Sequence, residues 1–181
     1  MDSVTGLTYA DLASFPDDGL RREIIDGELI VSPSPRIRHQ AVLGRLHLIF
    51  GNYVEAKGGG LVLFAPMDVV FSDRNVVEPD LLFVAEDHSD VITEMNIQGS
   101  PTLVVEVLSN ARLDRVRKRE LYSRFSVPQY WIVDPDADRV EVYLPGPDGY
   151  GKPEILEVGD VLSYDRLPGL QVDLAKLFRR G

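Results

Sequence analysis

Hydrophobic and polar positions alternate in a way that predicts an N-terminal hairpin followed by a long helix. Asp26-Gly27 stands between two apolar runs, residues 22–25 and 28–31, and this dipeptide is a strong signal for a tight β-hairpin. Beyond it, apolar residues recur at helical spacing from Arg36 to Lys57. Three consecutive glycines, residues 58–60, end that helix.

The rest of the chain predicts a sheet with helices packed against it. Extended patterns cover residues 61–71, 76–85, 102–108, 129–133 and 139–144, and Pro66 is expected to interrupt the first of them. A helical pattern covers residues 112–126, and short strands with a last small helix are expected between residues 154 and 179. The central order is helix, strand, strand, strand, helix, strand, which predicts an α/β fold of the α+β kind with a mixed sheet. The N-terminal hairpin and a C-terminal β extension flank this core.

Length and composition fit one globular domain over residues 1–181. Hydrophobic residues make up 44% and charged residues 27% of the chain, as in ordinary globular proteins. The absence of cysteine excludes disulfides, thiolate zinc sites and a cysteine nucleophile. No run of 18 apolar residues predicts a membrane helix, and the N-terminus has no secretory pattern, so we expect a cytoplasmic protein.

Charge is distributed unevenly along the chain. The net charge is -10, which by itself argues against strong non-specific binding to nucleic acid. Two segments nevertheless carry a positive excess, residues 33–47 and residues 110–125. They are either solvated helix surfaces or parts of one face that meets phosphate groups.

Two carboxylates interrupt strongly apolar strands. Asp80 precedes the run Leu81–Val84, and Glu106 lies inside Leu103–Leu108. A buried carboxylate requires a cation, a metal or a proton. Two carboxylates on neighbouring strands, with a backbone carbonyl such as that of Val107, suit Mg²⁺. The ordinary alternative is an acid at a strand end that reaches solvent or caps a helix.

Lys118 lies on the apolar stripe of the predicted 112–126 helix. On a wheel of 100° per residue, Leu121 and Tyr122 fall within about 60° of it, so the lysine is expected to face the sheet. An ammonium there can orient an attacking water or stabilise charge that develops on a phosphate. The alternative is an ion pair with Asp114 along the helix.

The chain resembles the PD-(D/E)XK nuclease fold and, more narrowly, the Uma-two family of restriction-endonuclease-like proteins. The resemblance rests on several stretches that together span nearly the whole chain: LTYADL (7–12), EIIDGELIVSPSPRIRHQ (23–40), VVEPDLLFV (76–84), LVVEVLS (103–109), KRELY (118–122), VPQYWIVDP (127–135) and LPGLQVDLAKLF (167–178).

The resemblance implies a restriction-endonuclease-like core and a metal-dependent phosphodiesterase site built from Asp80, Glu106 and a lysine. In the simplest family pattern the lysine stands two residues after the glutamate, where this chain has Leu108. Lys118 on the following helix is the matching amine. The resemblance also points to Glu23 and His39 as accessory residues.

These observations favour a Mg²⁺-dependent DNA endonuclease, with Mn²⁺ as the other suitable ion. Asp80, Glu106 and Val107 would hold the metal, and Lys118 would serve the attacking water. Four arginines of the basic segments are the candidate nucleic-acid contacts: Arg36, Arg38, Arg115 and Arg119. A homodimer is expected, since one site per chain cuts one strand. The alternatives are a non-catalytic or weakly catalytic interaction module on a nuclease fold, and a site for another phosphate ester or a small nucleic acid.

Overall fold

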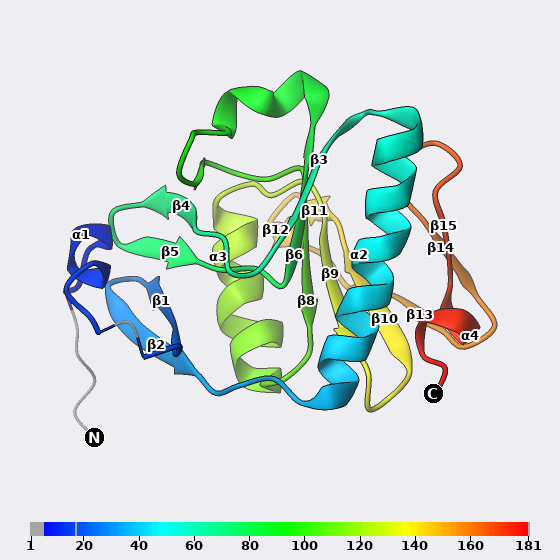
Figure 1. Ribbon diagram of the computed structural model, residues 1–181, viewed down its shortest axis with the longest axis horizontal. Helices are drawn as coiled ribbons and strands as arrows, with labels where there is room; N and C mark the ends of the chain where they lie inside the picture. The colour runs from blue at the N-terminus through cyan, green and yellow to red at the C-terminus, as the bar shows by residue number, and fades with distance from the viewer. Residues whose placement is uncertain (1–5, 17, 181) are drawn as a thin grey trace.

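The computed structural model describes residues 6–16 and 18–180, and its centre is a mixed six-stranded sheet (Figure 1). Only the contact between β8 and β9 is parallel; the other neighbours in this sheet are antiparallel. This confirms the predicted α+β class with a mixed sheet. In spatial order the strands are β13 (Glu154–Glu157), β10 (Arg139–Tyr143), β9 (Tyr130–Asp134), β8 (Leu103–Val107), β6 (Leu81–Ala85) and β3 (Gly60–Phe64).

A second, smaller sheet lies beside the main one and carries the N-terminal hairpin. Asp26 and Gly27 both have positive φ, 55° and 78°, as a tight two-residue hairpin turn requires, so the predicted hairpin is confirmed. In spatial order the strands are β2 (Glu28–Ser32), β1 (Arg21–Ile25), β5 (Asn75–Val77), β4 (Val69–Ser72) and β7 (Ile97–Gln98).

The prediction of one continuous strand over residues 76–85 is wrong. The chain leaves the small sheet after β5, passes through Glu78-Pro79-Asp80, and enters the main sheet as β6. Pro79 has no N–H to give to a ladder, so a strand is readily broken there. The expected interruption of residues 61–71 at Pro66 is confirmed, because the segment is divided between β3 and β4. Asp80 therefore stands at the start of a strand rather than inside one.

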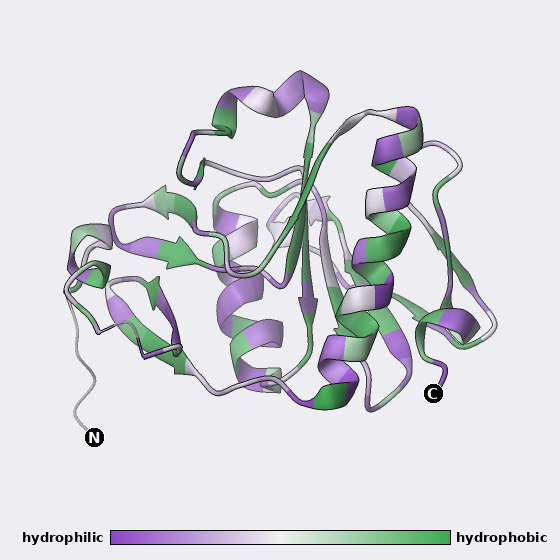
Figure 2. Cartoon of the chain, in the orientation of Figure 1, coloured by the Kyte–Doolittle hydropathy of each residue, from purple (hydrophilic) through white to green (hydrophobic). Residues whose placement is uncertain are grey.

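Two helices cover opposite faces of the main sheet. Figure 1 shows α2 (Ile37–Lys57) on one side and α3 (Arg119–Arg124) on the other. Leu81 and Phe83 of β6 pack into the core under α2, whereas Leu82 and Val84 pack into the core under α3. Successive strand residues point to opposite faces, which explains why the central strands are mostly hydrophobic in Figure 2.

The helix that carries Lys118 has an irregular first part. Leu113–Lys118 (η2) is π-helical and continues directly into α3. The predicted 112–126 helix is thus confirmed in position, with a wider turn than the wheel assumed. Such π segments are uncommon and often lie at functional sites.

Short elements complete the fold. They are α1 (Tyr9–Leu12), the 3₁₀ segment η1 (Glu86–Val91), the hairpins β11 (Pro145–Gly146)–β12 (Gly149–Tyr150) and β14 (Val161–Ser163)–β15 (Gln171–Asp173), and α4 (Leu174–Leu177). The predicted C-terminal β extension is confirmed. Within the described residues, no helix has the length and apolar character to cross a membrane.

Candidate active site

Asp80 and Glu106 lie side by side at adjacent ends of β6 and β8. β6 and β8 are antiparallel, and Leu81 is opposite Val105. Asp80, just before Leu81, therefore lies next to Glu106, just after Val105. The Val107 N–H donates to Asp80 Oδ2 at 2.8 Å. Both carboxylates are buried, which places this pair of acids inside the molecule as the sequence indicated.

Lys118 reaches the same place from the helix side. Its Nζ lies 2.9 Å from Glu106 Oε1 and 2.8 Å from Glu23 Oε1, and only 2% of the residue is exposed. The expected orientation toward the sheet is confirmed. Asp114, the alternative partner, instead accepts hydrogen bonds from the backbone N–H groups of Ser109 and Asn110.

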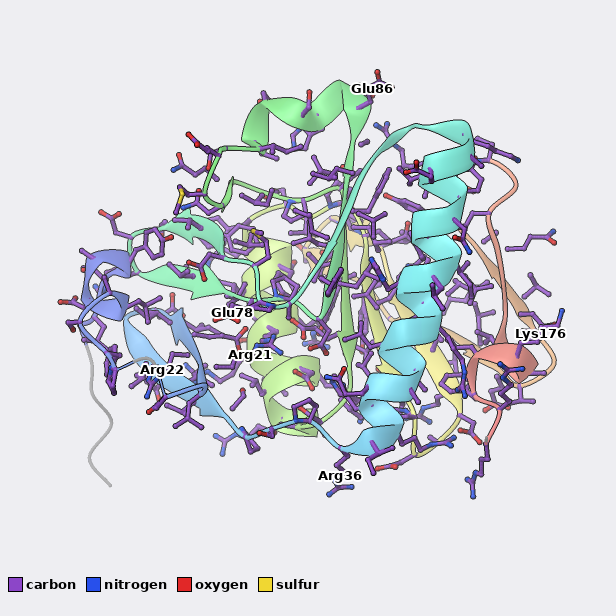
Figure 3. All side chains as sticks on the ribbon, in the orientation of Figure 1. Arg21, Arg22, Arg36, Glu78, Glu86 and Lys176 are labelled. Atoms are coloured by element: carbon purple, nitrogen blue, oxygen red, sulfur yellow. The ribbon has the colours of Figure 1, made fainter. Side chains whose placement is uncertain are left out.

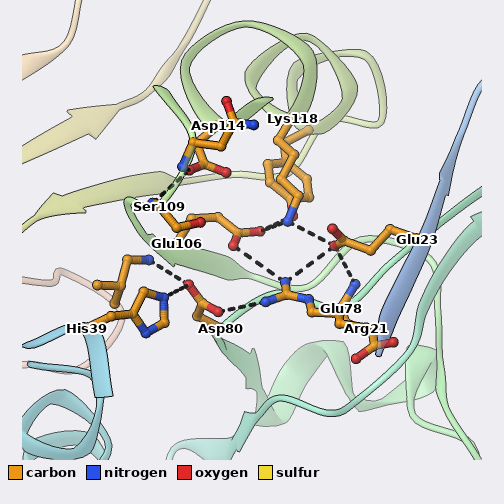
Figure 4. Close-up of polar contacts among 12 residues, drawn as sticks. Arg21, Glu23, His39, Glu78, Asp80, Glu106, Ser109, Asp114 and Lys118 are labelled. Carbon is orange, nitrogen blue, oxygen red and sulfur yellow. Dashed lines mark hydrogen bonds and ion pairs between the residues drawn. The ribbon is translucent and has the colours of Figure 1, made fainter. Parts of the chain in front are cut away.

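The two accessory candidates also join the carboxylates. Glu23 on β1 is fully buried and accepts the backbone N–H of Glu78 at 2.9 Å as well as the Lys118 ammonium. His39 in the first turns of α2 places Nε2 3.1 Å from Asp80 Oδ2. Figure 4 shows these side chains converging from the small sheet, the main sheet and both helices.

Arg21 is a site residue that the sequence reasoning missed. Its Nη1 lies 2.8 Å from Asp80 Oδ1, and its Nη2 lies 3.3 Å from Glu23 Oε1 and 3.7 Å from Glu106 Oε2. The available signal was its spacing: Arg21 stands two residues before Glu23 on one strand, so both point to the same face. We call Arg21, Glu23, Asp80, Glu106 and Lys118 the site cluster.

Tyr122 is a second missed contact, expected only as a core residue. Its hydroxyl donates to Glu106 Oε1 at 2.7 Å, while its ring packs in the core beneath α3. Glu106 Oε1 thus receives both this hydroxyl and the Lys118 ammonium. The tyrosine fixes the orientation of the glutamate carboxylate.

The two oxygens of each central carboxylate, Asp80 and Glu106, have different partners. One oxygen accepts hydrogen bonds from neighbouring side chains or the backbone, and the other contacts Arg21. Asp80 Oδ2 accepts from His39 and Val107, and Glu106 Oε1 accepts from the helix side. Within the described part of the chain, Asp80 Oδ1 and Glu106 Oε2 have Arg21 as their single polar side-chain partner. These two oxygens are therefore pre-oriented toward a common cation.

The surroundings shift the protonation of the two acids in opposite directions. Burial alone would raise the pKa of Asp80, but the His39 hydrogen bond and the Arg21 charge outweigh it and lower that pKa to about 2. Burial raises the pKa of Glu106 to about 7, against the attraction of the Lys118 ammonium. Asp80 is ionised at neutral pH, whereas Glu106 is poised near its midpoint.

Lys118 stays protonated at neutral pH. Burial disfavours its charged form, but the attraction of Glu106 and Glu23 is stronger and raises the pKa of Lys118 above its ordinary value. The half-buried Glu78 beside the cluster has its pKa raised to about 7, chiefly by burial. The lysine is thus suited to stabilise negative charge and not to accept a proton.

The chemistry of the donor set fits a hard divalent cation. Mg²⁺ prefers oxygen ligands and is often held by one or two carboxylates together with several waters. In residues 6–16 and 18–180, no group of three or more His, Cys, Asp or Glu side chains is arranged to hold a metal. Asp80 Oδ1 and Glu106 Oε2 supply two carboxylate oxygens, which is enough for a Mg²⁺ ion that keeps several of its waters.

The four arginines considered for nucleic-acid contacts differ in their surroundings. The Arg36 side chain is 89% exposed and makes a long contact, 3.9 Å, with the exposed Asp136, whereas Arg38 pairs with Asp138. Arg115 Nη2 lies 2.8 Å from Asp134 and 2.6 Å from Glu141. Arg119 is half-buried, and nothing in the described segments forms an ion pair with it. The charges of Arg38 and Arg115 are therefore compensated by acids of the chain itself.

Comparisons with known proteins agree with this fold. The structure superposes on that of a putative nuclease belonging to DUF820 from Anabaena variabilis ATCC 29413, with a TM-score of 0.79 and 18% identity, over 95% of this chain and 97% of that one. A weaker likeness, with a TM-score of 0.42, 15% identity and 71% of this chain, involves 15% of the type IIG restriction endonuclease BpuSI and carries no argument. Among curated proteins no match was found.

The sequence itself matches a family model over residues 8–175, which contain every member of the site cluster. That model is described as "Putative restriction endonuclease". The match covers most of the chain, including the stretches that carry the family resemblance from residue 23 to residue 135. The chain belongs to the Uma2 family of restriction-endonuclease-like proteins.

Proposed function

We propose that this chain is an endonuclease that hydrolyses phosphodiester bonds of DNA with Mg²⁺, or Mn²⁺ in its place. The observation that carries the proposal is the pair of pre-oriented oxygens, Asp80 Oδ1 and Glu106 Oε2, next to a buried, protonated lysine. Membership of a family described as putative restriction endonucleases favours phosphodiester hydrolysis as the reaction. We further propose that residues 1–181 act as one nuclease domain.

The metal would be held by Asp80 and Glu106, with the carbonyl of Val107 as a further ligand. When bound, a divalent cation supplies Lewis-acid stabilisation of charge on the phosphate oxygens. His39 holds Asp80 Oδ2 and Tyr122 holds Glu106 Oε1. Such outer contacts fix ligand orientation and are worth a large part of metal affinity.

Lys118 would act on the phosphate and on the attacking water. Its ammonium is held between Glu23 and Glu106 and is excluded from solvent. In a buried site a fixed positive charge stabilises the charge that develops in the transition state far more than it would in water. Because the lysine remains protonated, it does not take the proton of the water; that proton would pass to solvent or to a base that is not a metal ligand.

DNA is the proposed substrate, and Arg36 is the best placed of the predicted phosphate contacts. Its guanidinium is exposed before the first turn of α2, the helix that also carries His39. Arg119 is the second candidate, while the partners of Arg38 and Arg115 weaken the case for both. One site per chain cuts one strand, so we propose that a homodimer cuts duplex DNA.

The test combines metal binding with cleavage on the whole protein. Calorimetric titration with Mg²⁺ and Mn²⁺ is done on the wild type, on Asp80→Asn and on Glu154→Gln, which removes an exposed acid of β13. The same proteins are incubated with plasmid DNA and with RNA of matched length. We expect metal binding and metal-dependent nicking of DNA by the wild type and Glu154→Gln, and loss of both in Asp80→Asn.

Each other outcome is informative. Wild-type protein that binds no divalent ion at millimolar concentration refutes the proposal and favours an interaction module on a nuclease fold. Cleavage of RNA alone refutes DNA as the substrate. Equal nicking by the wild type and Asp80→Asn refutes the site.

A further inference from the structure

Arg21 occupies the place between the oxygens to which a metal would bind. Its guanidinium contacts Asp80 Oδ1 at 2.8 Å and Glu106 Oε2 at 3.7 Å, the two carboxylate oxygens that the rest of the framework leaves free. A third contact, at 3.3 Å, reaches Glu23 Oε1. We propose that Arg21 is an exchangeable counter-ion: it neutralises the site cluster in the metal-free protein, and a divalent cation displaces it from these oxygens. This inference rests on the metal site of the proposed function.

Arg21 is held less firmly than the other cation of the site cluster. Lys118 is 2% exposed and has two contacts shorter than 3 Å, whereas the Arg21 side chain is 23% exposed. The buried Arg21 Nε has no hydrogen-bond partner, and an unpaired buried N–H costs free energy. Figure 3 shows Arg21 directed toward the centre of the molecule, whereas its neighbour Arg22 lies at the edge. Arg21 is therefore the cation that can leave.

The charge balance also favours exchange. When ionised, Glu23, Asp80 and Glu106 carry three negative charges, of which the Lys118 ammonium neutralises one. A guanidinium compensates half of the remainder, while a divalent ion compensates all of it. With both present, two cations would share the same oxygens, and their repulsion is strong where little water screens it. The metal and Arg21 should thus exclude one another.

This competition sets the affinity of the site for metal. Filling the site requires the guanidinium to give up its carboxylate contacts, so metal affinity is reduced by the stability of the Arg21-bound state. Removing the charge of Arg21 removes the competitor, although it also leaves the metal-free cluster poorly neutralised. The same substitution should therefore weaken the metal-free protein and strengthen metal binding, a combination that a purely structural arginine would not give.

The test compares Arg21→Gln with Arg22→Gln on the whole protein. Arg22 is on the same strand, but its partner is Asp18, away from the site cluster, so it controls for loss of an arginine. With EDTA, Arg21→Gln should melt below the wild type and below Arg22→Gln. In calorimetric titrations with Mn²⁺, it should bind at least about tenfold more tightly than either, a change equal to about 1.4 kcal/mol, and Mn²⁺ should raise its melting temperature by more.

Equal or weaker Mn²⁺ binding by Arg21→Gln overturns the inference while leaving the proposed function intact. Absence of metal binding in all three proteins defeats the proposed function and this inference with it. A second measurement needs no stable variant: the Nε–H signal of Arg21 in wild-type protein with ¹⁵N-labelled arginine. Its exchange with solvent should accelerate on saturation with Mg²⁺, because the buried Nε becomes exposed. An unchanged signal at saturation also overturns the inference.

Discussion

Replacing Lys118 with methionine tests whether the site cluster is a true buried ion network. Methionine keeps most of the apolar stem and removes the ammonium. The substitution leaves Glu23 Oε1 and Glu106 Oε1 without the partner that lies at 2.8 Å and 2.9 Å. Arg21 already contacts Glu23 Oε1 at 3.3 Å and Asp80 at 2.8 Å, and it approaches Glu106 only at Oε2, at 3.7 Å, so it does not replace the ammonium at Glu106 Oε1.

The expected cost follows from the burial of the pair. Removal of one partner from a buried ion pair typically destabilises a protein by about 3–5 kcal/mol. For a chain of this size, a loss of 1 kcal/mol lowers the melting temperature by about 2–4 °C. Lys118→Met should therefore melt about 6–20 °C below the wild type at neutral pH, without added metal.

The loss should depend on pH with a definite sign. Burial already raises the pKa of Glu106 from 4.5 to about 7 in the folded protein, and loss of the ammonium raises it further. When the pKa of an acid is higher in the folded than in the unfolded protein, the free energy of unfolding falls as pH rises between the two pKa values. The difference between Lys118→Met and the wild type should thus be small at pH 5 and larger at pH 8.

Thermal and urea unfolding followed by circular dichroism, with EDTA from pH 5 to pH 8, measures the effect. Lys152→Met is the matched control, because Lys152 is exposed and its loss should stay within about 0.5 kcal/mol of the wild type. Adding Glu106→Gln to Lys118→Met should recover part of the stability. Equal melting of Lys118→Met and Lys152→Met at pH 8 would refute the reasoning.

Three further outcomes are expected. Asp80→Asn should lower the free energy of unfolding by about 2 kcal/mol at pH 5, because the pKa of Asp80 is lowered from 3.8 to about 2 in the folded protein. This stabilisation is lost as pH falls through that range, so the variant and the wild type should converge near pH 2 in urea unfolding; a constant difference would contradict it. Tyr122→Phe removes a donor to Glu106 and should cost about 1.5–3 kcal/mol, which urea unfolding with EDTA would measure; an unchanged midpoint would rule out that hydrogen bond. Gly60→Ala would place a Cβ 2.2 Å from the backbone oxygen of Val84 at a φ of +150°, so its melting temperature should fall by several degrees, and a wild-type value would contradict the strand geometry.

Local patterns were sufficient for most of the helices and strands, and they singled out Asp80, Glu106 and Lys118. A carboxylate inside an apolar run and a lysine on an apolar helix stripe are anomalies that a single sequence displays, because burial of an unpaired charge is costly. The sequence also contained a signal for the break at Glu78-Pro79-Asp80, since Pro79 has no N–H to donate to a neighbouring strand. It was missed because the apolar character of residues 76–85 is continuous on both sides of it.

Arg21 and the electrostatics of the site could not be read in this way. Its position on the site side of β1 depends on the pairing of Ile24 with Val76, a contact between distant segments that no local periodicity encodes. Likewise, the basic segment around Arg115 suggested a phosphate-facing surface, but the fold places Asp134 and Glu141 against that guanidinium. Charge counted along the chain does not show which charges are already neutralised.

The sequence by itself determined the kinds of groups present: strand carboxylates, one inward lysine, a tight hairpin and a mixed order of helices and strands. Those features depend on neighbours within one or two turns of the chain, where periodicity and turn chemistry act directly. Only the tertiary structure decided which groups meet. The small sheet brings Arg21 and Glu23 to the ends of β6 and β8, where they contact the other charged groups at distances near 3 Å. These contacts determine the pKa values of the acids and which carboxylate oxygens can face a cation. They could not be predicted from sequence order, because electrostatic energy depends on distance and burial.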